Sequence, residues 1–267
     1  MDVYADVGRY WDLFSDLFRR DFSVRFRGSA LGVAWTLLNP LLLMAVYTLL
    51  FSFLIKAPAI TSIPSFPLFV LTGLLAWIFF QGSVQTATGA LVGNASLVKQ
   101  VRFPRQLLPL SIVAANVFTL VAMLVVILPF TLWRLPETRA TFWACVLLLV
   151  PLVGFASGLS VLVACANAIF RDVEHIVAAL LLPWFLLTPI FWSFDALPAV
   201  QDHAWLVRLL YWGNPLTPMV EGIRAPLFFG EMPGALDVTY SVLVALGALA
   251  LGGYVFSRLD DQLVAQL

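Results

Sequence analysis

Three cationic side chains lie within seven residues of a polar segment, SLVKQVRFPRQLLPLS, at positions 96–111. Lys99, Arg102 and Arg105 stand out because the 42 residues before Lys99 and the 28 residues after Arg105 carry no charge. Ammonium and guanidinium groups bind phosphate or carboxylate oxygens, anchor a segment to lipid headgroups, or pair with acidic groups of another protein. The segment therefore indicates a ligand site, a membrane-surface anchor or a docking surface, and its residue types leave all three open.

Catalytic chemistry is not indicated. A phosphate-binding loop needs a glycine-rich turn that ends in Gly-Lys-Ser/Thr, whereas the only lysines, Lys56 and Lys99, follow Ile and Val. The histidines and cysteines are isolated from other ligating side chains: His175, His203, Cys145 and Cys165. We therefore expect no ATPase or other enzyme activity in this chain, no metal site and no bound cofactor.

The composition is that of an integral membrane protein. Of 267 residues, 61% are hydrophobic and 11% are charged, and the mean hydropathy is +0.96. Soluble domains contain about 25% charged residues, so this chain cannot bury its apolar surface in one water-surrounded core. The formal net charge is zero, which gives no electrostatic indication of nucleic-acid binding.

The charge-free runs predict an all-α protein with six transmembrane helices, because a span needs roughly 20 apolar residues and lipid offers no partners for backbone hydrogen bonds. The expected spans cover about residues 30–55, 66–92, 107–133, 141–169, 176–194 and 238–257. Lysines and arginines divide ten to five between the two sets of loops. The positive-inside rule therefore places both termini in the cytoplasm.

Two segments outside the spans have helical patterns of their own. Residues 3–20 carry apolar side chains three and four positions apart, which predicts an amphipathic helix in the membrane interface or, alternatively, against a partner protein. Residues 195–237 contain five prolines and only short apolar stretches, which predicts re-entrant or surface-lying helices on the outer side. Glu221 and Arg224, three residues apart, are expected to pair along one of these helices.

The expected spans contain essentially no ionisable side chains, so the chain has no evident machinery for coupling to ions. Three classes of membrane protein remain: a passive channel, a structural subunit, and a permease powered by a separate protein. The powered permease needs a cytoplasmic docking surface, and residues 94–105 can form one. Here Leu97, Val101 and Phe103 would enter a groove of the partner, surrounded by the three cations. A simple topology signal explains the same charges equally well.

Four segments, taken together, resemble one family of transporters. They are RRDFSVRFRGSALGVAWTLLNPLLLMAVYTLLFS, LVKQVRFPRQLLPLS, NAIFRDVEHIVAALLLPWFLLTPIFW and YWGNPLTPMVEGIR, which run in order from about Arg19 to Arg224. In this order and spacing they resemble the membrane subunits of ABC-type polysaccharide and polyol-phosphate exporters, which include the O-antigen, teichoic-acid and capsule permeases.

The resemblance implies a homodimer of six-span subunits in the bacterial plasma (inner) membrane, bound to two copies of a separate nucleotide-binding ATPase that holds ATP and Mg. It implies that residues 21–29 form a cytoplasmic gate segment and residues 94–105 a coupling helix, which favours docking over a topology signal. It also implies that residues 195–237 form outer gate helices. The cargo would be a glycan on an undecaprenyl-diphosphate lipid, threaded between the subunits.

This cargo suggests two sets of contact residues. Sugar rings present apolar CH faces that slide over aromatic rings, and the candidates to line the channel are Trp35, Trp77, Trp184 and Trp192, although tryptophan is also usual in interface belts and cores. Arg25 and Arg27 are candidates for the lipid diphosphate, or positive-inside anchors. The alternatives are an ABC exporter of a drug, lipid or small molecule, and, from another class, a passive channel or scaffold subunit.

Overall fold

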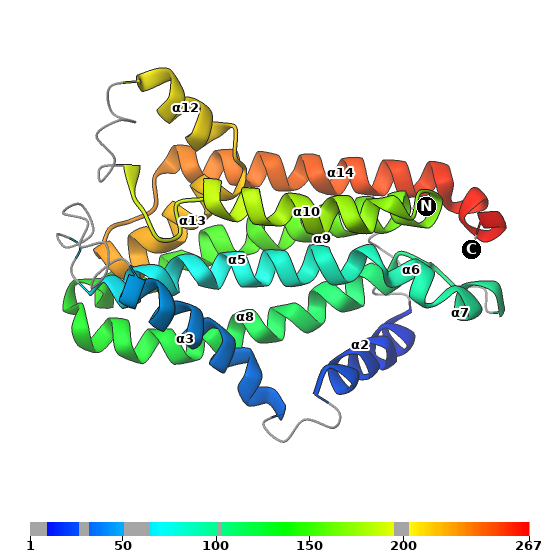
Figure 1. The fold of residues 1–267 in the computed structure, drawn as a ribbon, viewed down its shortest axis with the longest axis horizontal. Coiled ribbons are helices and arrows are strands. Elements are labelled where there is room, and N and C mark those ends of the chain that lie inside the picture. Colours follow the sequence, from blue (N-terminus) through cyan, green and yellow to red (C-terminus); the bar gives the residue numbers. More distant parts are fainter. Residues whose placement is uncertain are drawn as a thin grey trace.

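Four long helical segments run side by side along the molecule (Figure 1). They are α5 (Phe66–Thr88), α8 (Leu107–Arg134), η4 with α9 (Phe142–Cys145 and Val146–Ile169) and α14 (Ala235–Gln266). The computed structural model describes residues 10–26, 32–50, 63, 65–100, 103–194 and 203–266. Within these ranges the protein contains helices and no strand. The four segments are long and apolar enough to cross a membrane, as the charge-free runs predict.

Helix α5 is the centre of the bundle. Most of its side chains are buried, and it packs against α8, α9, α3 (Trp35–Thr48), α10 (Asp172–Leu187) and α13 (Leu216–Arg224). Large rings such as Phe69, Phe79 and Phe80 are almost inaccessible there. A helix that is apolar over most of its surface packs on most sides, so α5 provides the framework on which the other helices are arranged.

Glycines bring α9 and α14 into backbone contact. A Cβ atom on Gly158 would lie 2.5 Å from the backbone nitrogen of Leu249 and would overlap the carbonyl carbon of Ala248. A Cβ on Gly252 of α14 would in turn overlap the carbonyl oxygen of Gly158. Small residues permit such close approach between membrane helices. The sequence pattern Gly154/Gly158 therefore serves helix packing within one chain.

The first and fifth predicted spans both contain a helix, and the described bounds of the two helices differ from the predicted ones. Helix α3 has 14 residues and continues into a π-type turn at 49–50, and the residues from 51 to 55 lie outside the described part. Helix α10 has 16 residues, begins at Asp172 and ends at Leu187 instead of Phe194. It ends there because Pro189 disfavours the helical conformation at Thr188, which is extended with φ −89° and ψ 134°.

The remaining elements gather at the two ends of the bundle (Figure 1). One end carries α2 (Trp11–Phe26), α7 (Ala95–Gln100) and the C-terminal part of α14, and the short α6 (Ala90–Gly93) joins α5 to α7. The other end carries α12 (Ala204–Trp212) and α13, with η3 (Pro136–Ala140), η4 and the π-helical turn η6 (Ala225–Phe229). The count of lysines and arginines predicts the same assignment of these segments to two opposite sides of the membrane.

Helix α2 lies against α8. Leu17 is 4% exposed, Ser111 donates a hydrogen bond to Asp21 at 2.8 Å, and the rings of Phe22 and Phe118 meet edge to face. The helix continues to Phe26, so the first six residues of the predicted gate segment (21–29) are helical. No glycine or proline interrupts DFSVRF, which explains the continuation. Residues 3–9 and 27–29 lie outside the described part.

Candidate functional site

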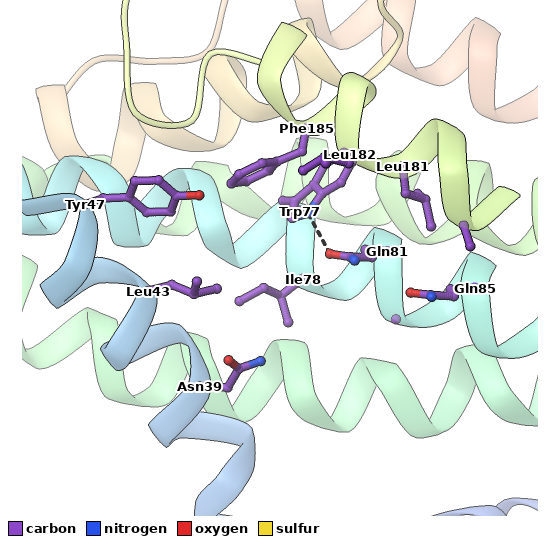
Figure 2. A pocket seen from close by; sticks show the side chains of 12 residues that line it. Asn39, Leu43, Tyr47, Trp77, Ile78, Gln81, Gln85, Leu181, Leu182 and Phe185 are labelled. Carbon is purple, nitrogen blue, oxygen red and sulfur yellow. Dashed lines mark hydrogen bonds between the residues drawn. The ribbon is translucent and has the colours of Figure 1, made fainter. Parts of the chain in front are cut away.

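A cavity of about 450 Å³ opens between α3, α5 and α10 (Figure 2). Each helix contributes side chains at helical spacing, so one face of each turns toward the cavity. The lining residues are Asn39, Leu43 and Tyr47 from α3, Trp77, Ile78, Gln81, Gly82 and Gln85 from α5, and Ala178, Leu181, Leu182 and Phe185 from α10.

Aromatic rings form one part of the wall. The ring centroids of Trp77 and Phe185 are 5.2 Å apart, and those of Tyr47 and Phe185 are 6.0 Å apart. Trp77 is 3% exposed and its indole N–H donates to the Oε1 of Gln81 at 2.8 Å, which fixes both side chains. Figure 2 shows these rings above the cavity, on the side of α10.

Neutral amides form another part of the wall. Gln81 and Gln85 lie one helical turn apart on α5, and Asn39 projects from α3 on the opposite side (Figure 2). An amide offers two N–H donors and a carbonyl acceptor. The lining residues therefore combine apolar ring faces with uncharged hydrogen-bonding groups, which suits a ligand that carries both hydroxyl groups and apolar CH surfaces.

Of the four tryptophans predicted to line a channel, Trp77 lines this cavity. Trp184 points to the other side of α10, where its ring packs on Phe80 and its N–H donates to Asn214 at 2.7 Å. Trp192 follows the end of α10 and donates to the carbonyl oxygen of Leu186, and Trp35 is 48% exposed at the start of α3. A channel role for these three stays a prediction.

The sequence prediction did not include the polar residues of the cavity. Asn39, Gln81 and Gln85 lie in charge-free runs, and a search for charged or catalytic side chains passes over them. The signal that would find them is the pair of glutamines four residues apart in an apolar helix. Gln81 is half-buried and Gln85 is exposed, and two amides one turn apart in an otherwise apolar helix mark a polar strip on its surface.

The predicted coupling segment (94–105) forms a short helix, α7, at one end of the bundle. Val98 is 3% exposed and Phe103 is 8% exposed, and both belong to an apolar cluster with Leu17, Leu107 and Phe256. Leu97 packs partly against the same cluster, whereas Ser96, Lys99 and Gln100 are exposed. The ring of Phe103 therefore lies in the core of the chain, contrary to the expectation that it enters a partner's groove.

Arg105 has a partner inside the chain. Its Nη1 lies 2.6 Å from the Oδ1 of Asp260 and donates to the backbone carbonyl of Asp260 at 3.0 Å, which ties the end of the coupling segment to α14. Lys99 is thus the described cation of the segment that faces outward. Val101, Arg102 and Arg27 lie outside the described residues, and Arg25 is placed on α2 by its backbone alone.

The sequence is similar to those of known transport proteins. The family model "ABC-2 type transporter" matches residues 12–228. The O-antigen export system permease protein RfbA of Myxococcus xanthus is 34% identical over 251 residues, which are 93% of this chain and 91% of that protein. A Klebsiella pneumoniae protein of the same name is 28% identical over 258 residues, 95% of this chain and 94% of that one. The polysialic acid transport protein KpsM of Escherichia coli is 24% identical over 243 residues, 88% of this chain and 89% of that protein.

Proposed function

Because this chain belongs to the ABC-2 type transporter family, we propose that it is the membrane permease subunit of an ATP-driven polysaccharide exporter. Relatives named as O-antigen export permeases align with nearly its whole length, which supports a glycan as the transported molecule. The cargo is a polysaccharide linked to undecaprenyl diphosphate, and the protein moves it outward across the bacterial plasma (inner) membrane with both termini in the cytoplasm.

The observation that carries this proposal is the cavity between α3, α5 and α10. Sugar rings have apolar CH faces that pack on aromatic rings such as Trp77, Tyr47 and Phe185, and their hydroxyl groups pair with amides such as Gln81 and Gln85. These contacts do not depend on the order of the sugars. A wall of this kind lets a long chain slide without being held at one position.

The passage is completed by a second copy of the chain. Large apolar side chains on α3 and α10, in or beside the cavity lining, are more than half exposed in the single chain: Leu42, Val46, Leu180, Leu182 and Leu186. In a homodimer with two-fold symmetry these side chains meet, and the two cavities face one another. Helices α3 and α10 then serve as the first and fifth of six spans, and α12 and α13 form the outer gate.

The energy comes from two copies of a separate ATPase subunit, which bind ATP and Mg. The docking surface is the exposed side of α7, formed by Ser96, Lys99 and Gln100. Behind it, Val98 and Phe103 fix the segment to the bundle, and the ion pair between Arg105 and Asp260 connects it to α14. Arg25, which lies on α2 at the same end of the bundle, and Arg27 receive the diphosphate of the lipid.

Reconstitution tests the proposal. The permease is incorporated into liposomes with the ATPase encoded beside it, and the transfer of a lipid-linked glycan is measured with and without ATP. We expect transfer only when both proteins and ATP are present. Full transfer by the permease alone would make it a passive channel, and stimulation of ATP hydrolysis by small hydrophobic compounds but not by glycan lipid would make it an exporter of small molecules.

Reversing the charge at Lys99 is expected to weaken the ATPase complex. In Lys99→Glu the affinity should fall by about tenfold or more, because like charges placed opposite each other at an interface repel. Binding of the purified ATPase to permease in nanodiscs, measured by light interferometry, gives the dissociation constant. Arg208→Glu on the exposed side of α12, at the other end of the bundle, is the matched control and should leave it unchanged. Equal affinities for both variants would remove α7 from the docking surface.

A further inference from the structure

Among the arginines that the structure describes, one is completely buried, at the place where α10 ends. Arg224, the last residue of α13, is 0% exposed, and its Nη1 lies 2.6 Å from the Oε1 of Glu221. The pairing of these two residues along the helix is as the sequence predicts. The guanidinium carbon also lies 3.8 Å from the centre of the Phe69 ring on α5. Burial lowers the pKa of Arg224 and Glu221 opposes this; arginine nevertheless remains charged in proteins.

The other end of this guanidinium binds the segment that follows α10. Its Nη2 donates to the carbonyl oxygens of Pro189 at 2.8 Å and Ile190 at 3.0 Å. These carbonyls have left the helical pattern, because α10 ends at Leu187. Buried carbonyls without partners are costly. Arg224 therefore supplies the hydrogen bonds that this extended segment lacks.

A second side chain reaches the same place from the turn before α13. Asn214 donates from its Nδ2 to the hydroxyl of Thr188 at 3.0 Å, and its Oδ1 accepts the N–H of Trp184 at 2.7 Å and the backbone N–H of Leu216 at 3.1 Å. The amide is thus shared between α10 and α13. Together, Arg224 and Asn214 fix the last turn of α10 and the three residues after it to α13.

The fixed part of α10 is also a wall of the cavity. Leu181 and Phe185, the only buried residues of this helix, lie within its last two turns and line the cavity from one side. Gly73 of α5 leaves room for the arrangement, because a Cβ there would lie 2.7 Å from the Nη2 of Arg224 and 3.0 Å from the Cα of Ile190. Three elements therefore meet at one guanidinium.

We propose that Arg224 and Asn214 are positioning residues that hold the cavity wall of α10 in place from the outer helix α13. Any displacement of α13 then moves Leu181 and Phe185, or else breaks four hydrogen bonds, three of them to buried groups and one to the half-buried indole of Trp184. The positional part of this inference stands on the contacts alone. Its consequence for transport rests on the proposed function, in which the cavity is the path of the glycan.

Thiol accessibility tests the inference. A single cysteine is introduced by Leu181→Cys, a position that is 3% exposed, in a chain whose own cysteines are replaced by Cys145→Ala and Cys165→Ala. The rate of reaction with a small methanethiosulfonate reagent is measured in the assembled complex. The double variant Arg224→Met/Glu221→Gln removes the donors without leaving a buried carboxylate unpaired. We expect labelling about tenfold faster or more, since this corresponds to the loss of one buried hydrogen bond to a charged group.

A second perturbation approaches the same contacts from α5. Gly73→Ala adds one methyl group that pushes against Arg224 and Ile190, and it should also accelerate labelling, by a smaller factor. Phe256→Ala controls for general loss of stability, because this ring is 1% exposed in the cluster at the opposite end of the bundle. At equal loss of thermal stability it should leave labelling at position 181 unchanged.

The outcomes separate this inference from the proposed function. Unchanged labelling in both Arg224→Met/Glu221→Gln and Gly73→Ala, or equal acceleration by Phe256→Ala, overturns the positioning role. If the double variant does not fold, Gly73→Ala decides alone. Faster labelling in a complex whose unmodified form does not transfer glycan lipid would support the positioning role and refute the glycan path.

Discussion

Gly158→Leu is expected to separate α9 from α14 and to prevent stable folding. At this position even a Cβ would overlap the backbone at Ala248 and lie 2.5 Å from the nitrogen of Leu249, so the backbones of the two helices must move apart at this crossing. We expect a cost above about 3 kcal/mol, which exceeds the usual range of about 1–3 kcal/mol for inserting atoms into a packed core, because the added side chain meets backbone. The fraction of monodisperse protein after extraction into mild detergent, and its thermal midpoint, measure the effect.

The matched control lies on the partner helix. Gly247→Leu places the same side chain at a glycine that has no atom within 4 Å of its Cβ position, and it should extract and melt like the unmodified protein. Equal behaviour of the two variants would mean that the contact between α9 and α14 is looser than the structure shows.

Ala178→Trp is expected to stop glycan transfer while the complex still assembles. Ala178 is exposed on α10 and lines the cavity, so an indole there occupies the space between α3, α5 and α10 without displacing a buried side chain. Transfer of lipid-linked glycan in proteoliposomes should fall to the level measured without ATP. Binding of the ATPase and its basal hydrolysis should remain, because α7 lies at the end of the bundle and makes no part of the cavity.

An exposed residue of α9 provides the comparison for this variant. Val150 is 66% exposed and is not part of the cavity lining, so Val150→Trp adds the same ring away from the cavity. We expect it to retain transfer. A loss of transfer in Val150→Trp alone would locate the path beside α9.

The positions of the helices follow from the charge pattern. Helix α8 begins at Leu107 as predicted and ends at Arg134, one residue later than predicted, because Arg105 and Arg134 limit the charge-free run. The end of α10 required a different signal, the proline at position 189, which acts through the backbone of the preceding residue. The prediction of 176–194 considered charge and ignored this proline.

The prediction was weakest for contacts between distant residues. Phe103 is apolar and lies beside cations, a pattern that fits a groove of a partner protein as well as the core of this chain. Which of the two places it occupies depends on how α8, α9 and α14 are arranged around it. Likewise, the partner of Arg105 is Asp260, which is 155 residues away in the sequence. Such pairs depend on the packing of whole helices, which residue spacing does not reveal.

The glycine contact also determines which helices can move independently. Since α9 and α14 meet backbone to backbone at Gly158 and Gly252, neither can slide or rotate relative to the other without steric overlap. A force applied near Asp260 is therefore transmitted to both helices as one rigid unit. Helix α10 is joined to α13 through Arg224 and Asn214, so these two helices are expected to shift together against this rigid two-helix support.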